Sequence, residues 1–112
     1  MTKQELNHHR ALLQRLEKNR KLLASLEAAG LADEATGIQD DIASLDAEVK
    51  QSEAVIMAWI STIDDPPTRT IIRLRFLRGF EWKTVATLIG AGNTRYCVER
   101  RASRYLEAHH DK

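Results

Sequence analysis

Leucine and isoleucine recur every three or four residues along the first half of the chain, which is the spacing of one face of a helix. In the first 29 residues this face is formed by Leu6, Leu13, Leu16 and Leu23. The spacing predicts one helix over residues 3–29. Gly30 ends it, because glycine adopts the left-handed backbone of a C-terminal cap, and Leu31 provides the hydrophobic contact of a Schellman turn.

A second long helix is predicted to begin near Asp33 or Thr36 and to end before Pro66. Thr36 and Gln39 have the spacing of a capping box. Pro66 disfavours helix at the residue before it, and Pro67 suits the first turn of the next helix. The apolar stripe of this helix advances in alternating steps of four and three: Ile38, Ile42, Leu45, Val49, Ser52, Ile56, Trp59 and Ile63.

The short connection around Gly30 predicts that the two helices fold back on each other as an antiparallel hairpin over residues 1–65. In that register His9 faces Ser52 as a polar layer. A two-helix hairpin buries little surface alone, so we expect it to form a homodimer, dock a partner, or pack as a scaffold on the rest of the chain. The apolar layers pair Leu23 with Ile38, Leu16 with Leu45, Leu13 with Val49, and Leu6 with Ile56.

Three shorter helices are predicted in residues 66–112, separated by Gly79 and by Gly90-Ala91-Gly92. A short helix, a glycine-bearing turn and a longer polar-faced helix are the parts of a helix-turn-helix, whose second helix lies in the DNA major groove. The predicted fold class is all-α, with an N-terminal coiled-coil-like hairpin followed by a three-helix helix-turn-helix domain. The three segments are Pro67 to Arg78, Trp82 to Ile89, and Asn93 to about His109.

The net charge of +1 conceals an uneven distribution. Residues 1–29 carry six basic and three acidic side chains, residues 30–65 carry one and nine, and residues 66–112 carry ten and four. The three parts therefore have charges of +3, −8 and +6. A basic C-terminal part is the electrostatic footprint of phosphate binding. The acidic middle must point away from DNA or pair with a basic group.

Several spaced positions in residues 76–106 resemble a known family. FLRGFEWKTVATLIG at residues 76–90 is followed by RRASRYL at residues 100–106. These runs resemble the fourth conserved region of bacterial sigma factors, and look closest to small phage regulators of the RinA/ArpU type. The motif positions are Leu77, Gly79 and Trp82, then Val85 to Gly90, and Arg101-Ala102 to Leu106.

The resemblance covers roughly residues 60–108 and implies a phage- or prophage-encoded transcription regulator that binds double-stranded DNA at a promoter. RNA polymerase is then a candidate partner of the hairpin. Two departures leave the register of the recognition helix start open by one residue. Gly92-Asn93-Thr94 shifts the cap that the family has soon after Gly90, and Arg95 stands where the family has an aliphatic residue.

A helical wheel divides the last helix into a core face and a DNA face. The predicted core face is Val98, Ala102, Tyr105 and His109, with Leu106 at its edge. Arg100 is the first candidate for a base contact, because arginine bonds bidentately to guanine. Arg69 and Arg73 suit contacts with backbone phosphates. The predicted DNA-binding residues are Lys83, Thr84, Asn93, Thr94, Arg95, Tyr96, Arg100, Ser103 and Arg104.

Other functional classes find little support in the residues. The turn at Gly90 follows a predicted helix and lacks the lysine of a phosphate-binding loop, so no enzyme activity and no cofactor are expected. The pairs His8-His9 and His109-His110 have no metal-ligand spacing, so no metal is expected. A single cysteine, Cys97, the lack of a signal peptide and the lack of a membrane-length apolar run predict a cytoplasmic protein.

Two alternatives stay open at this stage. Phage small terminase subunits also join a helix-turn-helix to a helical hairpin, and they recognise viral DNA for packaging. Their DNA-binding part usually precedes the hairpin, whereas here it follows. A helical module that binds only proteins is the third hypothesis.

Overall fold

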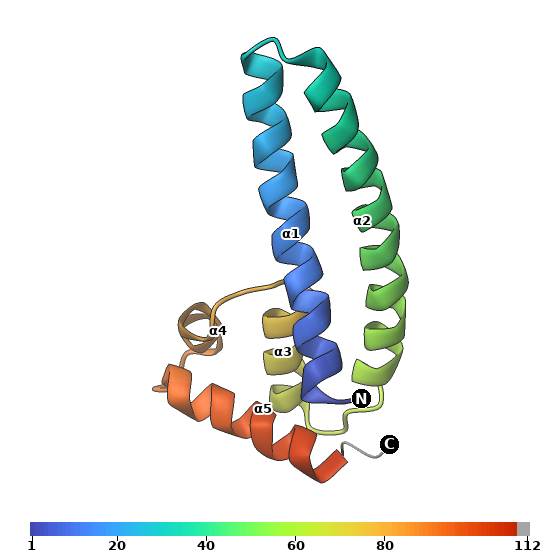
Figure 1. Cartoon of the computed structure of the whole chain (residues 1–112). Helices are drawn as coiled ribbons and strands as arrows, with labels where there is room; N and C mark the ends of the chain where they lie inside the picture. The colour runs from blue at the N-terminus through green and yellow to red at the C-terminus, as the bar shows by residue number, and fades with distance from the viewer. Residues whose placement is uncertain (110–112) are drawn as a thin grey trace.

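In the computed structural model, which describes residues 1–109, all regular structure is helical. Helices α1 (Lys3–Ala28) and α2 (Ala32–Ile60) run side by side in opposite directions, and we call this pair the arm (Figure 1). The C-terminal helices gather around one end of the arm and leave the other end free. They are α3 (Pro66–Ile72), its π-helical extension η1 (Arg73–Leu77), α4 (Trp82–Ile89) and α5 (Arg95–His109).

Both ends of α1 are capped by local hydrogen bonds. At its start the Thr2 hydroxyl accepts a bond from the Glu5 amide at 3.1 Å, and the Glu5 carboxylate accepts one from the Thr2 amide at 3.0 Å. At its end Gly30 has a φ of 75°, and Leu31 donates its amide to the carbonyl of Leu26 at 3.0 Å. The predicted helix and its Schellman turn are confirmed.

Helix α2 begins at Ala32, beside the predicted start near Asp33, so the alternative start at Thr36 and its capping box with Gln39 were wrong. The Thr36 hydroxyl instead donates to the carbonyl of Ala32 at 3.0 Å inside the helix. The Schellman turn has already returned the chain to helical geometry by Ala32, so no polar cap is needed further along. The helix also ends before the prolines. There the hydroxyl of Ser61 donates to the carbonyl of Ala58 at 2.6 Å, a local bond that competes with continued helix.

The middle of the arm contains the predicted pair Leu16 and Leu45, but Leu12 is buried where Leu13 was predicted, and Leu13 is only half-buried. Leu12, Leu16, Leu45 and Val49 form one buried cluster. The polar layer is also present: Nδ1 of the fully buried His9 lies 2.8 Å from the Ser52 hydroxyl. Farther out, Leu23, Leu26 and Ile38 are only half-buried, because two helices cannot enclose a core by themselves.

The main core joins the lower end of the arm to all of the C-terminal helices. On α5 the buried residues are Val98, Ala102 and Leu106. The helical wheel therefore misplaced the centre of this face: Leu106 is central, whereas Tyr105 and His109 are half-buried at its edge. The rings of Tyr105 and His109 are stacked, with their centroids 4.0 Å apart. The cluster contains Leu6, Ile56, Ile60, Ile63, Ile71, Ile72, Phe76, Val85, Ala86, Val98, Ala102 and Leu106.

Candidate nucleic-acid interface

The turn between α4 and α5 sets the direction in which α5 leaves the core. Gly90, Ala91 and Gly92 all have positive φ angles, of 69°, 54° and 78°. Two of the three are glycine, which adopts this backbone without a steric cost. Asn93 then closes the turn, because its amide N–H and its side-chain Nδ2 donate to the carbonyl of Gly90 at 3.1 and 2.8 Å.

Thr94 is the residue that caps α5. Its hydroxyl accepts a hydrogen bond from the amide of Cys97 at 3.2 Å, so the helix starts at Arg95. The register that the sequence left open is thereby defined in the structure. The same hydroxyl lies 3.3 Å from the Cys97 sulfur, and this hydrogen bond, with a smaller contribution from Arg100, lowers the pKa of the exposed thiol.

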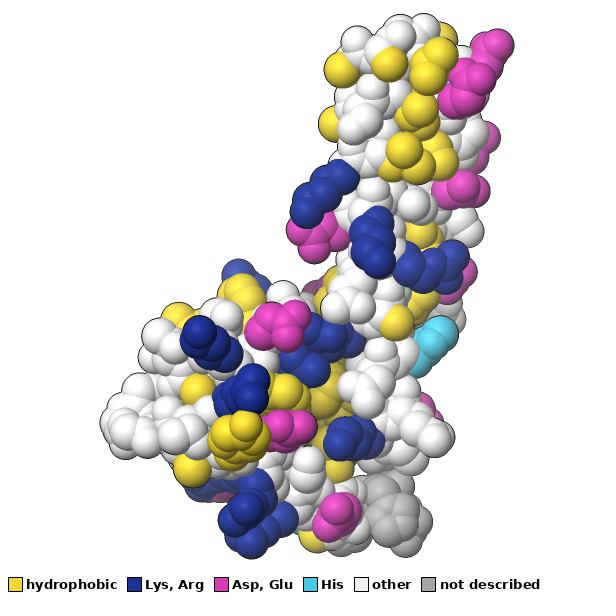
Figure 2. Space-filling model, turned by 60° about the vertical axis from the view of Figure 1, so that its left-hand side comes forward, with side chains coloured by type: hydrophobic (Ala, Val, Ile, Leu, Met, Phe, Trp, Pro, Cys, Tyr) yellow, Lys and Arg dark blue, Asp and Glu magenta, His cyan; other side chains and the backbone are white. Residues whose placement is uncertain are grey.

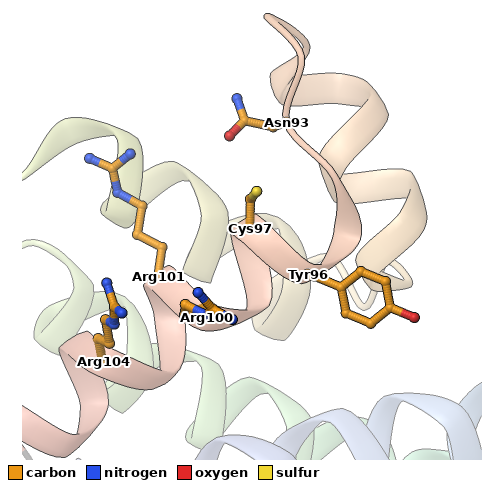
Figure 3. Close-up of a pocket in the computed structure, with 6 residues that line it drawn as sticks. All are labelled: Asn93, Tyr96, Cys97, Arg100, Arg101 and Arg104. Carbon is orange, nitrogen blue, oxygen red and sulfur yellow. The ribbon is translucent and has the colours of Figure 1, made fainter.

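A shallow hollow runs along the exposed side of α5 (Figure 3). Asn93 stands on the turn at one end, Cys97 and three arginines follow along the helix, and Tyr96 turns away to the side. Residues three or four positions apart share a helix face, which is why these side chains meet. The hollow is lined by Asn93, Tyr96, Cys97, Arg100, Arg101 and Arg104.

The three arginines of this hollow differ in what holds them. Arg101 donates from Nη2 to the Asp65 carboxylate at 2.9 Å and from Nε to the Thr68 hydroxyl at 3.1 Å. It therefore fastens α5 to the start of α3. Arg100 and Arg104 are exposed, and neither has an ion pair within residues 1–109. Their guanidinium groups remain available to an anionic ligand.

A second hollow lies between α4 and the start of α5, and Asn93 lines both hollows. Lys83 reaches it from the first turn of α4, and Arg95 from the first turn of α5. The Arg95 guanidinium donates to the Tyr96 hydroxyl at 2.8 Å and lies over the Tyr96 ring, with Cζ 4.8 Å from the ring centroid. The lining residues are Lys83, Ala86, Thr87, Asn93, Thr94 and Arg95.

Seven of the nine predicted site residues thus line two adjoining hollows, and two do not. Thr84 is exposed on α4 outside both. Ser103 is half-buried and lines a different hollow beside Lys3. The phosphate contact expected of Arg69 also meets an obstacle, because Arg69 donates to the carbonyl of Ile63 at 3.2 Å.

Three polar residues that line these hollows were not among the predicted ones: Cys97, Arg101 and Thr87. Cys97 and Arg101 continue the line of Asn93 in steps of four, so their spacing was a usable signal. Thr87 follows Lys83 by four residues on α4, and its hydroxyl donates to the Lys83 carbonyl at 3.0 Å. Cys97 is exposed and lies inside the first hollow.

Basic side chains are spread over the C-terminal helices and are mixed with apolar and acidic ones (Figure 2). Within residues 1–109 no group of three or more histidine, cysteine or acidic side chains is arranged to hold a metal ion, and His110 lies outside this range. Over the same residues no helix has the length and apolar character needed to cross a membrane.

The fold and this surface define an all-helical protein with an exposed basic helix face beside a glycine-rich turn. Comparisons of the chain with protein-family models, with curated proteins and with solved structures find no match.

Proposed function

We propose that this protein is a sequence-specific DNA-binding transcription regulator of phage type that acts at a promoter. In this proposal residues 1–65 form a helical hairpin, and residues 66–112 form a helix-turn-helix domain that resembles the fourth conserved region of sigma factors. Helix α4 supports α5, and α5 enters the major groove of double-stranded DNA. The protein has no catalytic activity of its own and works in the cytoplasm.

The observation that carries the proposal is the pair of free arginines on α5. Arg100 and Arg104 are exposed one helical turn apart and lack ion pairs within residues 1–109, while their neighbour Arg101 is tied to Asp65. On a helix face with a purely structural role, arginines are usually paired with carboxylates or surrounded by water. Here Asn93, a residue type that bonds to adenine edges, lines the same hollow, as do the guanidinium groups that bond to guanine edges.

In this proposal the second hollow contacts the DNA backbone, and the first hollow contacts base edges. Lys83 and Arg95 lie on either side of the turn, where a phosphate group could be held by charge and by the amide groups at the start of α5. Arg100 and Arg104 lie five and nine residues beyond Arg95, on the exposed side of α5 that would face base edges in this proposal. RNA polymerase is the partner that the resemblance suggests for the arm.

Selection from a randomised duplex pool, with sequencing of the bound fraction at two salt concentrations, tests this proposal. We expect one enriched motif, and affinity that falls steeply with salt because each phosphate contact releases counterions. Arg100→Ala should weaken the selected site by roughly 5- to 150-fold, which corresponds to about 1–3 kcal/mol for a bidentate base contact.

Two matched variants sharpen the result. Arg100→Lys keeps the charge but loses the planar fork, so it should retain salt-dependent binding and lose the preference at one base pair. Lys21→Ala removes a charge from the exposed arm, and should leave both affinity and motif unchanged. Binding without any enriched motif, which fades with salt in all variants alike, would refute sequence-specific recognition by α5.

A further inference from the structure

One side of the arm faces away from the C-terminal helices. On the opposite side of α1, Arg10 is bonded to Glu81 and Leu13 lies against Gly79. Seven residues make two turns of helix, so positions seven apart form a line. We call the exposed side the outer face: it consists of His8, Arg15 and Leu22 on α1 and of Glu34, Asp41, Glu48 and Val55 on α2.

The two lines of the outer face border a continuous surface. His8, Leu12, Glu48 and Val55 line one shallow hollow between α1 and α2, which shows that both lines lie on the same side of the arm. All seven side chains are exposed, and Val55 and Leu22 retain 60% and 43% of their accessible surface. In the register set by His9 and Ser52, Val55 is level with Leu6. Val55 and Leu22 therefore lie near opposite ends of the outer face, and only a partner about as long as the arm would bury both.

The outer half of the arm also lacks a closed core. The buried cluster of the arm extends only as far as Leu16 and Leu45. Beyond it Leu23, Leu26 and Ile38 are half-buried, and Figure 2 shows hydrophobic side chains gathered there with acidic side chains along the edge. Two more helices would complete this layer as a four-helix bundle.

The charges on the arm specify which helices can meet. Helix α1 carries six basic and three acidic side chains, and α2 carries one basic and seven acidic. Within residues 1–109 the one ion pair between them is Arg20 with Asp46, at 3.8 Å and on the side away from the outer face. Arg15 and Glu48 have no ion pair in the described part of the chain. The arm therefore offers a basic helix and an acidic helix, each with unused charge.

We propose that a second copy of this chain covers the outer face, with the two arms related by a two-fold axis parallel to the helices. Rotation about such an axis leaves the position along the helices unchanged and swaps the lateral positions of α1 and α2. Helix α1 of each copy therefore lies over α2 of the other. An axis across the arm would instead place α2 against α2, where the acidic side chains repel. The contact between His9 and Ser52 fixes the axial register of α1 and α2. In this register and with this axis, Arg15 faces Glu48 of the second copy.

The surface is large enough for a stable dimer. About 25 residues per helix give a length of about 37 Å, and two helices are about 20 Å wide, so about 700 Å² per copy is buried. A total of about 1,400 Å² is a standard size for a specific interface. The dimer also places both sets of C-terminal helices at the same end, although the dimerisation itself does not depend on any nucleic acid.

Sedimentation velocity of the full chain without DNA, over a range of concentrations at about 0.1 M salt, tests the proposal. The chain should be a dimer. Arg15→Glu and Glu48→Arg should each weaken dimerisation about tenfold or more, because each converts two attractive pairs into two repulsive ones. An equimolar mixture of the two variants should recover the dimer, because every pair between the unlike copies again has opposite charges.

Two controls accompany these charge reversals. Lys21→Glu makes the same charge change beside Glu17 and away from the outer face, so its dimerisation should stay within about twofold of the parent chain. Circular dichroism establishes that each variant is folded, as expected for exposed positions. A monomer at all concentrations, a ring of many copies, or a mixture that stays monomeric would overturn the parallel dimer.

Discussion

Glu81 lies where the arm, η1 and α4 meet, and it is the carboxylate that two arginines share. Its Oε1 accepts from Nη2 of Arg10 at 3.0 Å, and its Oε2 lies 3.9 Å from Nη1 of Arg75. Both arginine side chains are only 14% exposed, and the Nε of each is buried without a partner in the described structure. Glu81→Gln keeps the shape and removes the negative charge.

We expect Glu81→Gln to lower the free energy of unfolding by about 1–2 kcal/mol. A hydrogen bond to a charged group contributes about 1.5–3 kcal/mol when well shielded. Glu81 itself is 75% exposed, so water screens part of that contribution. The loss is nevertheless larger than for a surface pair, because the mutual repulsion of Arg10 and Arg75 is then opposed only by the weaker effect of Glu99 on Arg75. Burial, followed by the nearby charge of Arg10, already lowers the pKa of Arg75.

Urea unfolding followed by circular dichroism at 222 nm measures this loss, and Asp40→Asn serves as the control. Asp40 is exposed and has no ion pair within residues 1–109, so its neutralisation should change stability by less than about 0.5 kcal/mol. A cycle with Arg10→Ala should give a coupling energy of about 1 kcal/mol between Arg10 and Glu81. Equal midpoints for Glu81→Gln and Asp40→Asn would contradict a stabilising counter-charge at Glu81.

Buried and tethered side chains give three further predictions. Leu6→Ala, at a fully buried position of the shared core, should cost about 2–5 kcal/mol and lower one common unfolding transition in calorimetry; two separate transitions would contradict it. Burial lowers the pKa of His9, so the unfolded chain binds a proton at a higher pH than the folded one, and stability should fall as the pH drops below 6.5. The urea midpoint of the parent chain should therefore be lower at pH 5.5 than at pH 7.5, and this difference should shrink in His9→Gln. Arg101→Ala should lower the melting temperature because it loses the bonds to Asp65 and Thr68, whereas Arg104→Ala should keep the parent value, and equal melting temperatures of the two variants would contradict the different roles.

Local signals accounted for most helix boundaries. The bounds of α4 agree with the prediction because Gly79 and Gly90 interrupt the helical pattern on either side of it. The end of α1 followed from Gly30 for the same reason. For the start of α2 two local signals competed: the start near Asp33 agrees with the helix that begins at Ala32, whereas Thr36 lies inside that helix and does not cap it. Ranking such signals requires the backbone geometry.

The candidate site was predictable as a face but not residue by residue. Helical spacing placed Tyr96, Arg100, Ser103 and Arg104 on one side of α5; all except Ser103 line one hollow, together with Asn93 of the preceding turn. It could not show that Arg101 is bonded to Asp65, because this partner is 36 residues away in the chain. The junction of Arg10 with Glu81 spans 71 residues and has no local signature at all. Long-range ion pairs of this kind depend on the tertiary arrangement, which periodicity does not encode.

The orientation of the exposed face of α5 depends on contacts made far from that face. Val98, Ala102 and Leu106 fix one side of the helix in the core that includes Leu6 of the arm. Arg101 fixes its rotation, since a turn of about 100° about the helix axis would bring Arg100 to Asp65 and carry Arg101 into the solvent. The arm therefore contributes to the candidate interface without touching it. A substitution that loosens the shared core should therefore change the direction in which Arg100 and Arg104 point.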